Sequence, residues 1–227
     1  MSNGFNSLSQ SAAWRVLVEA AKQGATDSGY KLSRVPGRGL SNVWNLQKGG
    51  KTQIASIRTT RDLWFAFPPL EGGKKWKTLD DVDQVIVASV DQKENPKNIE
   101  VYMFPASEVR DRFKAAYAAR AKDGQVLRDG FGMWVALHKD QRGIAASIGS
   151  GLADRYKPVG IYPIDDLLAA RFDEVLVEQD ASDDESEAAE KSAFETIAEV
   201  MAWARAQVAA LAGVRVEAVK LDLKVEY

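Results

Sequence analysis

The chain contains no cysteine, which excludes a disulfide framework, a thiolate metal site and a cysteine nucleophile. It contains one histidine, His138, so a histidine-based metal site or a Ser–His pair needs partners from elsewhere in the chain. No apolar run approaches the roughly 18–20 residues that span a bilayer, and residues 1–10 lack the basic and apolar regions of a signal peptide. These absences favour a cytoplasmic protein.

Charge is distributed unevenly along the 227 residues. Residues 1–170 carry 24 lysines and arginines against 18 acidic residues, whereas residues 171–190 carry one base against nine acids. The chain is longer than one typical domain and short for two. We therefore predict a main domain over residues 1–170, an acidic linker over 171–188 with too little to bury to fold, and a small unit over 189–227.

The last part of the chain combines two periodic patterns. Residues 194–211 repeat apolar side chains in a heptad-like way, and residues 219–226 alternate apolar and charged side chains. One helix and one strand cannot form a core alone. We expect this helix–strand unit to dock on the main domain, bind a protein partner or pair with a second copy as a homodimer.

In the main domain, apolar spacing predicts a helix over residues 10–23, with Ser9 or Ser11 as its cap and Gly24 at its end. A second helix is predicted after Pro105, with Ser107 as its cap. Strands are predicted over residues 41–47, 52–60, 63–67, 82–90, 99–104, 132–138 and 159–162. Loops are predicted over 33–40, 71–77 and 143–151, and a short helix over 164–170. Together these elements indicate a mixed α/β fold with a central mixed sheet flanked by helices.

Residues 41–60 form a predicted hairpin around Gly49 and Gly50. Alternation places Ile54, Ser56 and Arg58 on one face of its second strand. This hairpin, the strands and helix that follow it, and the Phe-Pro pair at residues 104–105 resemble the core of the PD-(D/E)xK nuclease superfamily over residues 9–122.

The resemblance implies a Mg²⁺ site built from a carboxylate on one hairpin strand and an acidic-x-Lys pattern on the next. Ser56, Ile57 and Arg58 stand where the acidic-x-Lys pattern would be, Asn42 or Asn45 where the aspartate would be, and Glu19 where a helper acid would lie. Asparagine and serine are neutral and bind Mg²⁺ weakly, and arginine cannot act as a base at neutral pH. By this resemblance the candidate catalytic residues are Glu19, Asn42, Ser56 and Arg58. The metal site that they would form is altered from the pattern of the superfamily.

A cluster at Asp80, Asp81 and Asp83 offers replacement carboxylates for such a site. Its alternative interpretation is a polar start to the buried strand over residues 82–90. Only an active nuclease that uses these residues with Glu19 would need Mg²⁺ as a cofactor.

Basic residues around Trp76 suit nucleic acid, because cations meet phosphates and the ring can stack on a base. The alternative is a solvated loop whose tryptophan packs on the body of the domain. The candidate nucleic-acid-binding residues are Arg34, Arg38, Arg58, Arg61, Lys74, Lys75, Trp76 and Lys77.

Two functions of different classes follow from these patterns. The first is a nuclease-like, nucleic-acid-binding protein that has lost or altered its metal site, for which the resemblance implies a bacterial defence, restriction or mobile-element role. The second is an assembly subunit with no enzymatic activity that acts through residues 189–227.

Overall fold

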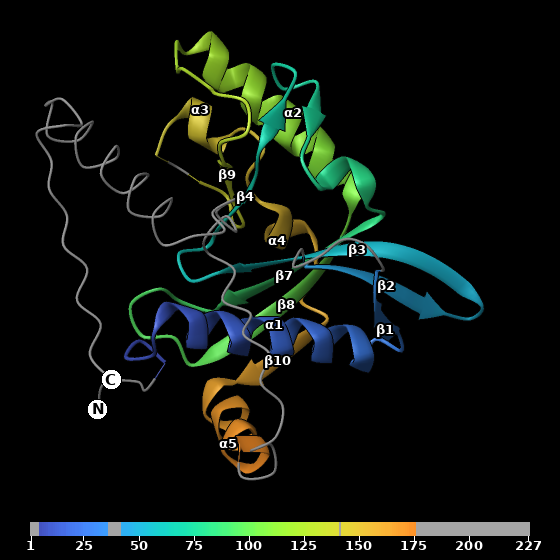
Figure 1. Cartoon of the computed structure of the whole chain (residues 1–227). Helices are drawn as coiled ribbons and strands as arrows, with labels where there is room; N and C mark the ends of the chain where they lie inside the picture. The colour runs from blue at the N-terminus through green and yellow to red at the C-terminus, as the bar shows by residue number, and fades with distance from the viewer. Residues whose placement is uncertain (1–4, 36–41, 141, 176–227) are drawn as a thin grey trace, which may run out of the picture. The chain divides into compact units, whose positions relative to one another are not determined.

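A six-stranded mixed sheet lies at the centre of this computed structural model, which describes residues 5–35, 42–140 and 142–175 (Figure 1). In sheet order its strands are β1 (Lys31–Arg34), β2 (Val43–Lys48), β3 (Lys51–Thr60), β7 (Gln84–Val90), β8 (Asn98–Pro105) and β10 (Gly160–Pro163). Neighbouring strands are antiparallel except β3 and β7, which are parallel. The predicted mixed α/β fold is confirmed, and its assignment to the nuclease superfamily stays a prediction.

Two apolar clusters cover the two faces of the sheet, because side chains alternate along each strand. Ile86 and Ala88 of β7 pack with α1 (Gln10–Asp27), whereas Val85 and Val87 pack with α2 (Ala106–Lys122). Figure 1 shows these two helices on opposite sides of the sheet. Further helices are η1 (Leu79–Asp81), α3 (Ile144–Ser147), α4 (Leu152–Arg155) and α5 (Ile164–Val175). None of the helices in the described ranges is long and apolar enough to cross a bilayer.

A separate two-stranded ribbon joins β4 (Trp64–Phe67) to β9 (Met133–Ala136) in antiparallel register. Its inner face belongs to the same apolar cluster as α2, where the rings of Phe65 and Phe67 each lie 5.4 Å from the ring of Phe113 in edge-to-face contacts. Both strands were predicted from the sequence. Their pairing outside the main sheet is a property of the tertiary structure.

The first helix is longer than predicted. Ser9 is its cap, because its side-chain oxygen accepts a hydrogen bond from the backbone nitrogen of Ala12 at 3.2 Å. Gly24 does not end the helix, which continues to Asp27; the glycine instead allows close contact with Val101 of β8. The predicted cap of the second helix is also wrong, because Pro105 occupies the cap position and no side chain bonds there.

Several predicted loops contain regular structure. The edge strand β1 occupies the start of the loop predicted over 33–40, and β5 (Pro69–Leu70) pairs with β6 (Lys75–Trp76) across the loop predicted over 71–77. The loop predicted over 143–151 contains α3. Helix α5 runs five residues into the predicted linker, because residues 165–175 contain no glycine or proline to stop it. The predicted unit over 189–227, most of the linker and Arg38 lie outside the described residues.

Candidate nucleic-acid interface

The outer face of the β4–β9 ribbon presents two tryptophans. Because Phe65 and Val135 point into the core, alternation places Trp64 and Trp134 on the opposite face. In the register of the ribbon Trp64 pairs with Ala136 and Trp134 pairs with Ala66, so the two tryptophans are diagonal neighbours on this face. Trp134 is 52% exposed.

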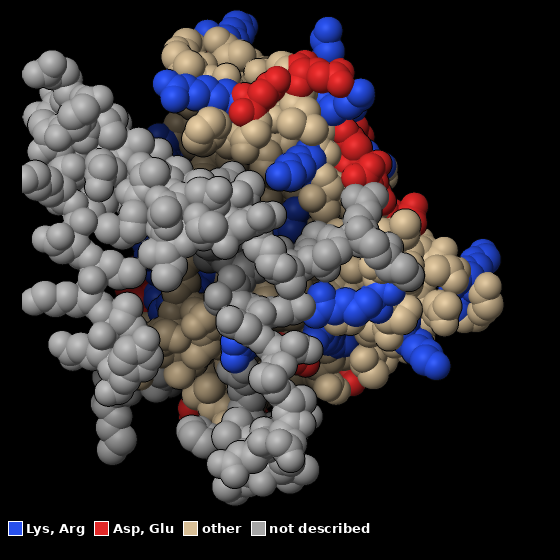
Figure 2. All heavy atoms as spheres, in the orientation of Figure 1, with Lys and Arg blue, Asp and Glu red and all other residues tan. Residues whose placement is uncertain are grey.

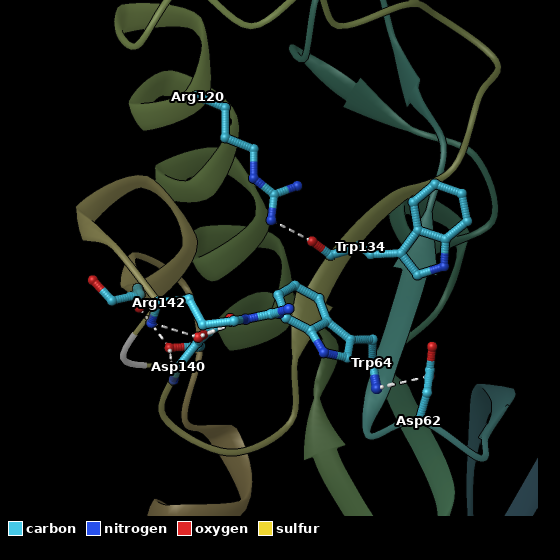
Figure 3. A network of polar contacts seen from close by, with 8 residues as sticks. Asp62, Trp64, Arg120, Trp134, Asp140 and Arg142 are labelled. Carbon is cyan, nitrogen blue, oxygen red and sulfur yellow. Dashed lines mark hydrogen bonds and ion pairs between the residues drawn. The ribbon is translucent and has the colours of Figure 1, made fainter. Parts of the chain in front are cut away.

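Arg142 extends this surface by stacking on Trp64, with its guanidinium carbon 4.6 Å from the ring centre (Figure 3). Asp140 orients the guanidinium, because its carboxylate accepts hydrogen bonds from Nη2 at 2.9 Å and from Nε at 3.2 Å. These hydrogen bonds from Arg142 hold the pKa of Asp140 below its usual value despite burial. Asp140 is therefore ionised at neutral pH, and it fixes the arginine while leaving one guanidinium face to Trp64.

Trp134 is positioned by two neighbours. Arg120 of α2 donates a hydrogen bond from Nη2 to the Trp134 carbonyl oxygen at 2.6 Å, which ties β9 to the helix (Figure 3). The indole lies back over Gly132, where an added β-carbon would be 2.9 Å from ring atom Cη2. We call the surface formed by Trp64, Trp134, Arg120 and Arg142 the aromatic–arginine face.

The entry of the chain into β4 is strained and strongly bonded. Leu63 has a φ of 67°, a left-handed conformation that few residues other than glycine adopt. The backbone nitrogen of Trp64 donates to Thr60 Oγ1 at 3.0 Å and to Asp62 Oδ1 at 3.2 Å. Such bonds maintain a turn that costs free energy by itself, and they place Trp64 at the start of the ribbon.

Basic and acidic side chains are interspersed on the face of the described residues that Figure 2 shows. A single basic stripe, typical of proteins that bind nucleic acid mainly through phosphates, does not dominate that view of the described part. Binding at the aromatic–arginine face would depend on stacking together with a few cations.

Two of the predicted basic residues, Arg34 and Arg61, lie far apart in the described part of the chain. Arg34 lies on the edge strand β1 with its guanidinium carbon 4.6 Å from the Trp44 ring centre. Arg34 pairs with Trp44, which in turn pairs with Ala55 of β3. Six residues separate Ala55 from Arg61, which is about 20 Å of extended chain. Arg61 donates to Asn6 Oδ1 at 3.4 Å.

The loop predicted to carry Lys74, Lys75 and Lys77 keeps these side chains exposed. Lys75 forms an ion pair with Glu71 at 2.7 Å. Trp76, however, is 1% exposed, and its ring lies 5.3 Å from that of Phe113. Trp76 is therefore a core residue, and a ring in this position cannot stack on a base.

The predicted catalytic residues lie on both faces of the sheet. Ser56 and Arg58 share the face toward α2, and Arg58 lies over Phe67 with its guanidinium carbon 4.4 Å from the ring centre. Glu19 lies on α1, which packs on the opposite face, and pairs with Lys22 at 2.6 Å. The structure therefore does not bring Glu19 to Ser56 and Arg58.

The hairpin positions are also unsuited to a metal ion in this arrangement. Ser56 is fully buried, and its hydroxyl has no hydrogen-bond partner among the described residues. Asn42 accepts a backbone hydrogen bond from Ile57 at 2.8 Å, and Asn45 donates to the Arg34 carbonyl oxygen at 3.4 Å. A carboxylate at residue 56 would be buried without a partner.

The aspartates near residue 80 bond to the backbone. Asp80 accepts from the Trp76 nitrogen at 2.7 Å, and Asp83 accepts from the Ile54 nitrogen at 2.8 Å. Within residues 5–35, 42–140 and 142–175, no three histidine or acidic side chains are grouped to hold a metal ion. The backbone bonds of Asp80 and Asp83 agree with the interpretation that these residues form a polar start to the buried strand over residues 82–90.

His138 has a partner that sequence reasoning did not identify. Its Nδ1 lies 3.0 Å from Oδ1 of Asp154, the third residue of α4. Sequence reasoning also missed the aromatic–arginine face. The alternation of Trp64 and Trp134 with buried neighbours was a signal for it, but the sequence did not show that the two strands pair.

The chain matches no protein-family model, no curated protein and no solved structure. The resemblance of residues 9–122 to the nuclease superfamily therefore stays a prediction from the sequence.

Proposed function

We propose that this protein binds nucleic acid as a nuclease-like domain with an altered metal site, and that it holds single-stranded segments on the aromatic–arginine face. The observation that carries this proposal is the stack of Arg142 on Trp64 beside the exposed Trp134. Aromatic rings stack on unpaired bases, and arginine contacts both bases and phosphates. A duplex keeps its bases stacked on one another, so we expect weaker binding of double-stranded substrates.

Two further observations support this function. Residues 1–170 carry a net charge of +6 from 24 basic and 18 acidic residues, which favours binding of a polyanion. Ser56 and Arg58 replace an acidic residue and a lysine in the pattern that the resemblance implies, which favours binding over metal-dependent cleavage.

The test is binding of the full chain to labelled single- and double-stranded DNA and RNA across a salt series, measured by fluorescence anisotropy. We expect preference for single strands and a shallow slope of log K against log salt, roughly −1 to −2, because two or three cations contact phosphates. Equal affinity for duplex and single strand would contradict the role of the tryptophans. Absence of binding to all four substrates at low salt would contradict the function itself.

Protein assembly is a second candidate function, which one observation favours. In the described sheet β10 is an edge strand, and its residue Ile161 is 55% exposed on the face that Glu100 shares. An exposed apolar edge strand is a surface that other chains can pair with. Light scattering of the wild type and Ile161→Lys tests this candidate, which predicts a loss of oligomer in the variant.

A further inference from the structure

We propose that His138 and Asp154 form a general-base pair that cleaves single-stranded RNA held on the aromatic–arginine face. This inference rests on the proposed function, because the RNA must first bind beside the pair. It goes beyond that function by assigning a reaction and a substrate class.

The histidine is oriented by a fixed carboxylate. Asp154 Oδ1 lies 3.0 Å from His138 Nδ1, and Asp154 Oδ2 accepts a hydrogen bond from the Lys139 backbone nitrogen at 2.8 Å. Burial raises the pKa of Asp154, but the hydrogen bonds from His138 and Lys139 outweigh it and hold that pKa below its usual value. An ionised carboxylate only accepts, so Nδ1 of neutral His138 carries the proton and Nε2 carries the lone pair.

The base is accessible and lies close to the proposed binding surface. The His138 side chain is 44% exposed, and Asp154 is its hydrogen-bond partner within the described residues. Ala136 pairs with Trp64 in the ribbon, and His138 follows two residues later. Two residues further on, Asp140 binds Arg142 of the aromatic–arginine face. Lys139, which is exposed, adds a cation at the same place.

The surroundings of His138 indicate which nucleophile it would activate. The chain has no cysteine, and no serine or threonine hydroxyl bonds to His138 within the described residues. A base without a protein nucleophile can act on a hydroxyl of the substrate. RNA carries a 2′-hydroxyl beside each phosphate, and DNA does not.

The reaction is an internal transphosphorylation. His138 Nε2 takes the proton of the 2′-hydroxyl while O2′ forms a bond to phosphorus and the P–O5′ bond breaks. Water supplies a proton to the departing 5′ oxygen, and the imidazolium returns its proton to water. The products are a 2′,3′-cyclic phosphate and a 5′-hydroxyl, and Lys139 stabilises the charge that develops on the phosphate oxygens.

The experiment incubates the full chain, in EDTA, with one sequence prepared as RNA, as 2′-O-methyl RNA and as DNA. Binding is measured by anisotropy and the product ends by mass spectrometry. Wild type is compared with His138→Ala, Asp154→Asn and the exposed-site control Lys157→Ala. We expect cleavage of RNA only, with cyclic phosphate ends, and a loss of at least about 100-fold in rate for His138→Ala with unchanged binding. Asp154→Asn should lower kcat and leave KM unchanged, since it positions the base.

Two outcomes would overturn the inference alone. One is RNA that binds normally and stays intact, and the other is a cleavage rate that His138→Ala does not change. RNA that neither binds nor is cleaved would overturn the proposed function as well, so the two failures are distinguishable.

Discussion

Gly24 of α1 lies against Val101 of β8 so closely that a β-carbon at residue 24 would be 2.7 Å from Val101 Cγ1. This contact sets the distance between the first helix and the sheet, and it explains a glycine inside an otherwise regular helix. Glycine in a helix costs about 1 kcal/mol relative to alanine, and here close packing offsets that cost.

Gly24→Ala should therefore lower the free energy of unfolding by about 1 kcal/mol, because overpacking outweighs the gain in helix propensity. Urea unfolding followed by circular dichroism measures this change. The exposed neighbour Gln23→Ala is the control and should stay within about 0.5 kcal/mol of wild type. If Gly24→Ala were instead more stable than wild type by about 1 kcal/mol, the helix would be able to move away from Val101.

Trp134→Ala and Trp64→Ala should each weaken binding of single-stranded nucleic acid by about 5- to 150-fold, the range for loss of one base–aromatic stack. Anisotropy titrations at one salt concentration measure the change. Val126→Ala, which removes another exposed apolar side chain, is the control and should bind as wild type. If the two tryptophan variants bind as tightly as the control Val126→Ala, the bases do not stack on Trp64 or Trp134.

Arg142→Lys keeps the positive charge and loses the planar group that stacks on Trp64. We expect about 2- to 5-fold weaker binding, the value of an exposed cation–π contact. Arg15→Lys, an exposed change on α1, serves as the matched control in the same titration. Unchanged affinity of Arg142→Lys would mean that the residue contributes charge alone.

Ser56→Ala should raise the free energy of unfolding by about 1 kcal/mol, because it removes a buried hydroxyl without a partner. The control is Ser89→Ala, which removes a buried hydroxyl that donates to the Val90 carbonyl oxygen at 2.9 Å and should cost about 1 kcal/mol. Ser56→Asp, which introduces an acidic residue, should cost about 3–5 kcal/mol through an unpaired buried charge. Chemical denaturation should show that Ser56→Ala is the most stable of the three variants and Ser56→Asp the least stable. Equal stability of Ser56→Ala and Ser89→Ala would contradict this expectation.

Glu108 at the start of α2 accepts hydrogen bonds from Tyr156, Arg155 and Arg112. Burial raises the pKa of Glu108, but the bond from Tyr156 and the two arginine charges lower it more, below the ordinary value of 4.5. A lowered pKa in the folded state stabilises the protein above the ordinary value, and this stabilisation is lost as the pH falls through the folded-state value.

Glu108→Gln should therefore cost about 1–2 kcal/mol at pH 7, and its difference from wild type should shrink as the pH falls below 4.5. Thermal unfolding across a pH series measures this, with the exposed-site variant Glu94→Gln as the control. A difference that stays constant with pH would mean that the charge of Glu108 does not contribute.

Much of the fold could be predicted from the sequence because its signals are local. Alternation around Ser56 and Arg58 assigned both residues to one face of β3, and the apolar run over residues 82–90 predicted the buried strand β7. The sequence offered Ser9 or Ser11 as the cap before the first apolar repeat, and Ser9 is the cap in the structure. Each of these signals depends on residues within a few positions of one another.

The candidate site could be predicted only in part. Trp64 and Trp134 lie 70 residues apart in the numbering, and their own patterns predict strands without indicating that these strands pair with each other. Lysines around Trp76 suggested a stacking residue, yet Phe113 of α2 buries that ring. Burial of a side chain depends on which distant element packs over it. The residues next to Trp76 in the sequence do not indicate that α2 covers its ring.

The sequence by itself determined most strands of the sheet, although not β1, and the chemical types available, with one histidine and no cysteine. Only the tertiary structure decided that Arg142 stacks on Trp64, that His138 meets Asp154, and that α1 places Glu19 on the other side of the sheet from Ser56. Periodicity is read from neighbouring residues, whereas strand pairing and the packing of helices on a sheet bring together residues that the chain separates.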